Sequence, residues 1–122
     1  MKRSPMKNIT IEEEIQAKGK TAPRITPVDI EANIKSEWYF TATDGVEGVQ
    51  RGPEWQATPV ALDLLTFCVL VLQNGFTVTG ESACASPENF DAEIGRKIAR
   101  ENAKQKIWPL MGYELRTKLS TK

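Results

Sequence analysis

The feature that most constrains the fold of this chain is a pair of β-rich runs separated by Asn74-Gly75. Residues 64–72 form a nine-residue run without a charged side chain, and residues 76–81 continue it with Phe, Thr and Val. Asn-Gly between two such runs indicates a type I′ turn, because both central residues need positive φ angles. The sequence therefore predicts an antiparallel hairpin whose two-residue loop is Asn74-Gly75.

A two-residue loop also fixes which side chains share a face of the hairpin. It pairs Val71 with Val78 on one face and Leu70 with Thr79 on the other. Alternation then gives the residues expected to pack against the helix that follows: Phe67, Val69, Val71 and Val78. The same register places Cys68 and Cys84 on opposite faces, which predicts two free thiols.

The first strand of the hairpin is apolar on both faces, so both must be covered, by helices, by a long loop or by another subunit. In the predicted register Leu70 and Leu72 face away from the helix. We therefore expect a homo-oligomer that buries either this face or a line of small residues on the helix, Gly95, Ala99 and Ala103. The alternative for that line is close packing of the helix on the sheet.

Two segments before the hairpin carry local signals. Thr26 and Pro27, with Asp29 three residues after Thr26, are typical of a helix start and a capping box, and this helix is expected to reach about residue 35. Residues 37–43 are rich in aromatics and threonine and predict a strand. Residues 44–59 contain three glycines and two prolines and predict a long loop.

After the hairpin, Ser86-Pro87 is expected to open the main helix, which should run to about Ile107. Trp108 precedes Pro109, and this order disfavours continued helix, so a shorter second helix should start at Pro109. The predicted fold class is α+β: a small antiparallel sheet with an Asn-Gly hairpin, packed against a long C-terminal helix that kinks or breaks at Pro109.

Residues 1–24 are polar and predict a mobile N-terminal arm, with a short helix around residues 10–17 as the alternative. Residues 25–122 are expected to form a single α+β domain that includes the long loop at 44–59.

Composition excludes several function classes. Lys+Arg and Asp+Glu both number 16, so no global charge favours nucleic acid or an anionic membrane. The chain has no histidine, which removes histidine-based catalysis and most zinc sites, so we expect no enzyme, no metal and no cofactor. The longest apolar run is too short to cross a membrane. Two cysteines and a polar N-terminus predict a cytoplasmic protein with reduced thiols.

The candidate binding residues lie mainly on the predicted main helix. Arg96, Arg100 and Lys104 follow one another at a spacing of four on one flank, and Arg100 lacks an acidic partner along the helix. This row is either a solvated flank or a set of contacts for an anion or phosphate. Asn102 falls within the apolar arc of the helix, so its amide serves either a structural hydrogen bond or a ligand.

Two aromatic residues complete the candidate set. For a nucleotide ligand, Phe76 or Trp55 would stack on the base while the arginines hold phosphate. Trp55 is also the marker of an alternative, in which the long loop binds a host protein, because tryptophan is enriched at binding hot spots.

Several segments together resemble a known family. The resemblance is carried by residues 66–84, Ser86 to Asp91, residues 93–97, Glu101-Asn102-Ala103, Ile107 to Leu110 and Gly112-Tyr113. These segments are similar, in order and spacing, to the small tailed-phage proteins of the Gp-forty-nine and gene-sixty-six family, over roughly residues 64–115. The resemblance implies a phage or prophage protein made inside a bacterial cell, and it supplies no function.

The leading hypothesis is a non-enzymatic phage accessory protein, homo-oligomeric, that counters host defence by sequestering a small anionic ligand such as a nucleotide signal. One alternative is a protein-interaction module that inhibits or redirects a host protein. The other is a nucleic-acid-binding regulator, which the zero net charge and the lack of a known binding motif disfavour.

Overall fold

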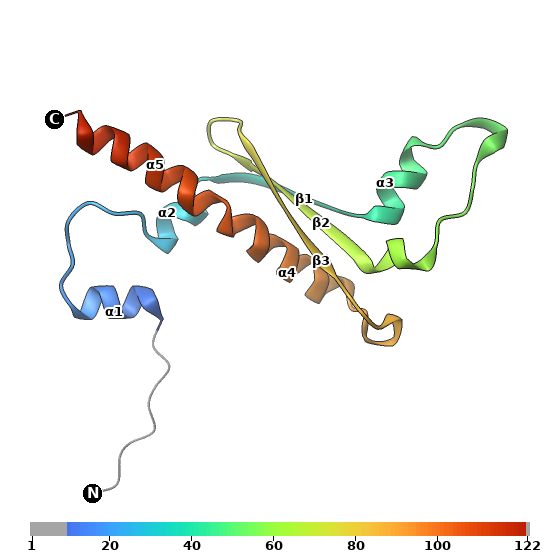
Figure 1. Ribbon diagram of the computed structural model, residues 1–122, viewed down its shortest axis with the longest axis horizontal. Helices are drawn as coiled ribbons and strands as arrows, with labels where there is room; N and C mark the ends of the chain where they lie inside the picture. Colours follow the sequence, from blue (N-terminus) through green and yellow to red (C-terminus); the bar gives the residue numbers. More distant parts are fainter. Residues whose placement is uncertain (1–9, 122) are drawn as a thin grey trace, which may run out of the picture.

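The computed structural model describes residues 10–121 and is built around a three-stranded antiparallel sheet (Figure 1). The strands are β1 (Ile34–Thr41), β2 (Leu65–Leu72) and β3 (Thr77–Ala83), in the order β1-β2-β3. Helix α4 (Ala92–Gln105) packs on β2 and β3, and α5 (Ile107–Ser120) continues past the sheet. The predicted fold class is confirmed. No helix in the described part of the chain is both long and apolar enough to span a bilayer.

The hairpin forms as predicted, but its register differs by one residue. Leu70 pairs with Val78 and Val69 with Thr79, because the loop has three residues, 73–75. The Gly75 N–H donates to the Leu72 carbonyl at 2.9 Å, and Gly75 has a φ of 90°. This is a type I turn followed by a left-handed glycine, the usual three-residue hairpin connection. Asn74 has no positive φ, so the predicted type I′ turn is wrong.

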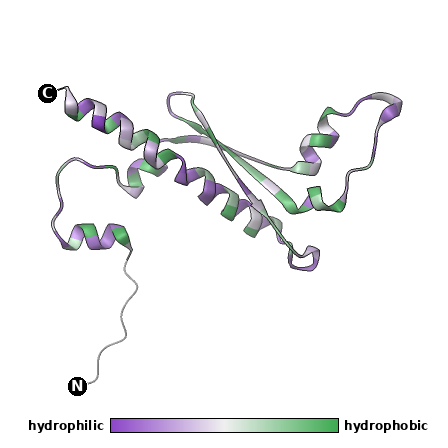
Figure 2. Ribbon diagram, viewed as in Figure 1, coloured by the Kyte–Doolittle hydropathy of each residue, from purple (hydrophilic) through white to green (hydrophobic). Residues whose placement is uncertain are grey.

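This shift reverses the faces of β2. The side chains that face α4 are Thr66, Cys68, Leu70 and Leu72, all buried. The prediction that Phe67, Val69 and Val71 pack against the helix is therefore wrong, as is the prediction that Leu70 and Leu72 face away from it. On β3 the prediction holds, since Val78 is buried beneath the helix. Figure 2 shows most of β2 as hydrophobic, in keeping with a strand that is apolar on both faces.

Helix α4 approaches the sheet closely through its small residues. Gly95, Ala99 and Ala103 are all buried. A Cβ atom on Gly80 of β3 would lie 2.3 Å from both the Ala99 carbonyl oxygen and the Ala103 nitrogen. The line of small residues thus packs on the sheet, which was the alternative to a contact between subunits.

The two C-terminal helices begin and end for identifiable reasons. Helix α4 starts later than predicted: residues Pro87–Asn89 form a separate 3₁₀ turn, and Asp91 accepts from the Ile94 N–H as the N-cap. The break falls at Lys106, three residues before Pro109. Proline lacks the N–H that would bond to the carbonyl of Gln105 four residues earlier, so α4 ends there.

The segment before the sheet follows its capping signals. Helix α2 (Pro27–Ala32) has the predicted capping box between Thr26 and Asp29, but it is shorter than predicted. The predicted strand forms, but β1 ends at Thr41. A second capping box, between Thr41 and Asp44, starts α3 (Ala42–Val49), which takes the last two residues of the predicted strand and the first six of the predicted loop.

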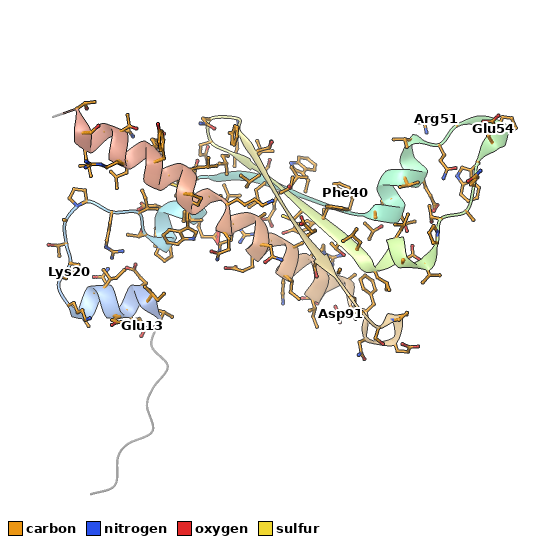
Figure 3. The ribbon with its side chains drawn as sticks, in the orientation of Figure 1. Glu13, Lys20, Phe40, Arg51, Glu54 and Asp91 are labelled. Atoms are coloured by element: carbon orange, nitrogen blue, oxygen red, sulfur yellow. The ribbon has the colours of Figure 1, made fainter. Side chains whose placement is uncertain are left out.

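Only part of the predicted loop is irregular. Two 3₁₀ turns, Gly52–Glu54 and Val60–Leu64, follow α3 and lead into β2. This connection projects from one end of the sheet, and Figure 3 places Arg51 and Glu54 at its tip.

The N-terminal segment contains the short helix that was the alternative to an arm. Helix α1 (Ile11–Ala17) has Thr10 as its N-cap. Arg24 binds Glu12 through two hydrogen bonds of 2.7 Å, and this bond lowers the pKa of Glu12 to about 2. Residues 1–9, part of the predicted mobile arm, lie outside the described residues.

Both cysteines are free thiols. The reason differs from the predicted one, because Cys68 pairs with Gly80 while the Cys84 N–H bonds to the Leu64 carbonyl. The two thiols are thus four residues apart along the hairpin rather than on opposite faces. At about 3.4 Å per residue, this separation is too large for a disulfide.

Candidate functional site

The basic row on α4 is engaged with acidic residues from other elements. Arg100 donates to both carboxylate oxygens of Glu31 at 3.0 and 2.9 Å, and its Nε donates to Glu37 at 2.6 Å. Lys104 lies 3.0 Å from Glu31 and 3.4 Å from Glu101. The bond from Arg100, reinforced by Lys104, lowers the pKa of Glu31 to about 2. Two of the three basic residues thus already have carboxylate partners.

Arg96 differs from its two neighbours. It is exposed and lines a shallow hollow together with Tyr39, Phe40, Asp44 and other residues. It forms no salt bridge with any described residue. The carboxylate of Asp44 on the same hollow makes the site less suited to an anion.

The structure gives Asn102 a structural partner. Its Nδ2 donates to the Glu81 carbonyl of β3 at 2.8 Å. This is the structural hydrogen bond of the two alternatives, and it ties α4 to the edge strand.

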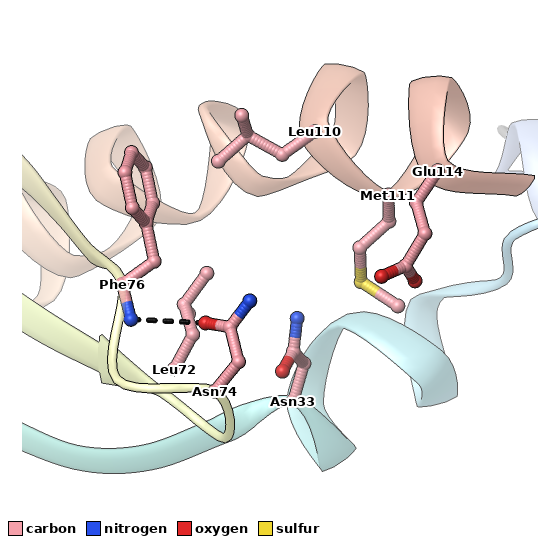
Figure 4. Close-up of a pocket in the computed structure, with 7 residues that line it drawn as sticks. All are labelled: Asn33, Leu72, Asn74, Phe76, Leu110, Met111 and Glu114. Atoms are coloured by element: carbon pink, nitrogen blue, oxygen red, sulfur yellow. Dashed lines mark hydrogen bonds between the residues drawn. The ribbon is translucent and has the colours of Figure 1, made fainter. Parts of the chain in front are cut away.

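The two candidate aromatic residues lie at opposite ends of the sheet. Phe76 follows the hairpin turn and is 56% exposed, whereas Trp55 lies in the projecting connection that leads into the start of β2 and is 52% exposed. Trp55 therefore cannot join Phe76 in one site. Phe76 lines a cavity of about 240 Å³ between the hairpin turn and α5 (Figure 4).

The most distinctive surface is the sheet face away from α4, which the sequence did not identify as a site. We call it the open face. It consists of three rows across β1, β2 and β3: Ser36, Val71, Thr77; Trp38, Val69, Thr79; and Phe40, Phe67, Glu81. Trp38 is 62% exposed and Phe40 is 39% exposed. Exposed aromatics on a sheet that has no covering layer commonly mark an interaction surface.

Local contacts hold the aromatic residues of the open face in place. The rings of Phe40 and Phe67 stack across the strands, with centroids 5.3 Å apart and planes at 21°. The Trp38 indole N–H donates to Ser36 Oγ at 3.0 Å, so its polar group is already satisfied. The remaining indole surface is apolar and available for contact.

Helix α3 borders the open face at Phe40 (Figure 3). A Cβ atom on Gly45 would lie 3.5 Å from the Phe40 ring. Val49 follows Gly45 by one helical turn, and both Val46 and Val49 are exposed. The apolar surface thus extends from the sheet onto α3.

In the sequence, Trp38 and Phe40 stand on either side of Tyr39, which indicates that the two aromatics share one face of a strand. Whether that face is covered by α4 could not be predicted, because the answer depends on the register of β2. Within residues 10–121, no three Cys, Asp or Glu side chains gather into a set able to hold a metal ion.

Comparison with known proteins gives one family. The model of the phage protein (N4 Gp49/phage Sf6 gene 66) family matches residues 25–119. A search of curated proteins and a search of solved structures each gave no match.

Proposed function

The chain belongs to the phage protein (N4 Gp49/phage Sf6 gene 66) family, and from this premise we propose that it is an accessory protein that works by binding, not by catalysis, in the cytoplasm of the infected bacterium. Its proposed working form is a homodimer joined through the open face. The observation that carries this proposal is the uncovered sheet face with the exposed rings of Trp38 and Phe40, both on the edge strand β1.

The size of the surface fits a modest dimer interface. With strand spacings near 4.8 Å and rises near 3.4 Å, the open face measures about 14 by 27 Å, or roughly 400 Å² in projection. Weak specific interfaces bury about 600 Å² per partner or less. Side chains that protrude from the sheet give it a larger surface area than its flat projection. With the exposed valines of α3, Val46 and Val49, the apolar area comes into this range.

The charge of the surface favours a second copy over a charged partner. Glu81 is the single ionisable residue in the three rows of the open face. A two-fold axis parallel or perpendicular to β2 would keep the two Glu81 carboxylates on different strands or at opposite ends. Neutral rows then face neutral rows, as in packed β-sandwiches. The nine residues of these rows include no lysine or arginine, so they offer no cation to a nucleic acid.

The proposal is tested by sedimentation of the full chain and two matched tryptophan variants. Burial of an aromatic side chain on this scale stabilises an interface by about 2 kcal/mol or more. Trp38→Ser should therefore weaken the dimer at least tenfold. Trp55→Ser, in the projecting connection, should leave it intact.

Two results would count against the dimer. One is a wild-type protein that sediments as a monomer at all accessible concentrations. The other is a Trp38→Ser variant that dimerises as tightly as the wild type. If only Trp55→Ser disrupted assembly, the projecting connection would replace the open face as the interface.

A second candidate role is binding of a host protein through the projecting connection. The observation that favours it is the half-exposed Trp55, on a segment that extends beyond the sheet. The readout is phage fitness: Trp55→Ser would impair this role while leaving the dimer intact.

Countering host defence by sequestering a small anionic ligand has weaker support. Arg100 and Lys104 are bound to Glu31 and Glu37, and only Arg96 is left for an anion among the three basic residues. An Arg96→Ala variant that keeps full biological activity would remove this role.

A further inference from the structure

The cavity beside the hairpin turn has polar groups arranged around an apolar floor. It is a half-open pocket between the turn of the hairpin, the end of α2 and the first turns of α5 (Figure 4). Leu72 and Met111 supply apolar surface, and Phe76 and Leu110 form the walls. Its volume of about 240 Å³ is below the roughly 300–1,000 Å³ of sites for drug-sized ligands, so it suits a single ring system.

Two asparagines turn hydrogen-bond donors into this cavity. The Asn74 Oδ1 accepts from the Phe76 N–H at 2.9 Å, and the Asn33 Oδ1 accepts from the Gln73 N–H at 3.2 Å. Because each amide oxygen is held by the backbone, each Nδ2 is directed away from it, and Figure 4 shows both nitrogens turned to the same space. Neither Nδ2 donates a hydrogen bond to any described residue. The pair therefore presents N–H donors to a ligand.

The opposite side of the cavity carries an acceptor. The carboxylate of Glu114 lies beside Met111 on α5 (Figure 4). One of its oxygens is 3.7 Å from Lys118, and both side chains are largely exposed. The site therefore offers two amide N–H donors on one side and a carboxylate acceptor on the other. It also disfavours an anionic group at this position.

From this arrangement we propose that the cavity binds a guanine-class base, that is, a 6-oxopurine. Its O6 and N7 are adjacent acceptors that suit the two asparagine Nδ2 groups. Its N1–H and N2–H₂ are donors that suit the Glu114 carboxylate. The Phe76 ring stacks on the base, since every base has a π-face. Adenine presents a donor at the position of O6 and would place it against the asparagine donors.

The site is independent of the proposed dimer. Phe76 lies opposite Leu72 across the hairpin turn, so its side chain is on the face of the sheet that α4 covers. The proposed dimer uses the opposite face. A Trp38→Ser variant should therefore bind a base as well as the wild type does. Failure of one proposal leaves the other standing.

The test is a titration of the full chain with guanosine, adenosine and guanosine monophosphate, followed by NMR or calorimetry. Guanosine should bind saturably below millimolar concentration and at least tenfold more tightly than adenosine. Glu114→Gln should weaken guanosine binding roughly tenfold to a hundredfold, because bonds to a charged group are lost. Phe76→Leu should weaken it about tenfold through lost stacking.

Glu93→Gln is the matched control. Glu93 forms the same kind of exposed pair, with Lys97 one turn on, but lies outside the cavity, so binding should not change. Comparison of guanosine with its monophosphate identifies the source: tighter binding of the monophosphate assigns a nucleotide, and equal or weaker binding assigns a nucleoside or free base. Lack of saturable guanosine binding, equal binding of adenosine, or no effect of Glu114→Gln would overturn the proposal.

Discussion

The central strand β2 is apolar on both faces of the sheet, but the two faces have opposite surroundings. On β2 the side chains of Cys68, Leu70 and Leu72 are almost completely buried under α4, while Phe67, Val69 and Val71, which alternate with them in the sequence, are only partly buried. A strand that is apolar on both faces is typical of a sheet covered on both sides. Within residues 10–121 of a single copy, one of the two covering layers is missing.

The two faces also differ in the kind of residue that makes contact. The covered face meets α4 through small residues, Gly80 against Ala99 and Ala103, so that the two backbones lie close together. The open face instead presents large rings, Trp38, Phe40 and Phe67. Close backbone approach suits a permanent contact within the chain, whereas protruding aromatics are enriched at binding surfaces.

The largest expected effect is on the covered face, at Gly80. In Gly80→Ala the new Cβ atom would meet backbone atoms of Ala99 and Ala103, which cannot move without shifting α4. We expect a loss of about 3 kcal/mol or more in the free energy of unfolding, measured by urea denaturation. Gly48→Ala in α3 is the control, since nothing lies within 4 Å of its added Cβ. It should be neutral or stabilising by up to about 1 kcal/mol.

Substitutions at two neighbouring residues of β2 compare the faces directly. Leu70 is completely buried, so Leu70→Ala should cost about 2–5 kcal/mol in the free energy of unfolding. Val69 is on the open face, and Val69→Ala should cost about 1 kcal/mol or less under conditions in which the chain is a monomer. Equal costs at both positions would mean that the open face is packed within one chain.

A smaller effect is expected from the ion pairs that join α4 to α2 and β1. The pKa of Glu31 is lowered from 4.5 to about 2 by Arg100, so its charged form stabilises the fold. Because the folded pKa is the lower one, this contribution is complete above pH 4.5 and is lost as the pH falls through about 2.

Substitution of Glu31 should make the free energy of unfolding depend less on pH in this acidic range. The Glu31 side chain is 46% exposed, so the effect should be roughly 1 kcal/mol or less. Glu31→Gln should reduce the fall in unfolding free energy over this range, and Glu93→Gln should not. Glu12 titrates in the same range in both variants, so the difference between them isolates Glu31.

Much of the fold follows from local signals in the sequence. The capping box at Thr26, the hairpin, the helix break before Pro109 and the small residues of α4 each have a cause within a few residues. The register does not, because Asn74-Gly75 is compatible with both a two-residue and a three-residue loop. The difference depends on whether Asn74 adopts a positive φ, and of these two residues only Gly75 does.

The missed features depend on residues that are distant in the sequence or on competing signals. Arg100 finds its acidic partners 63 and 69 residues earlier, which no spacing along α4 could show. Helix α3 was missed because Gly45 and Gly48 disfavour helix, although its capping box at Thr41 and Asp44 was readable. The open face could be assigned only once the register was known.

The most direct test of the account compares the reactivity of two adjacent thiols on opposite faces. In a Val69→Cys, Cys84→Ser variant, Cys68 reports on the covered face and the new thiol on the open face. Cys68 is completely buried, and burial raises the pKa of its thiol, so alkylation should be slow at every protein concentration. The thiol introduced at position 69 should react quickly in dilute protein and become protected as the concentration rises and the dimer forms. If the thiol at position 69 reacts equally fast at all concentrations, the open face is not covered by a second copy, and the proposed homodimer does not form through it.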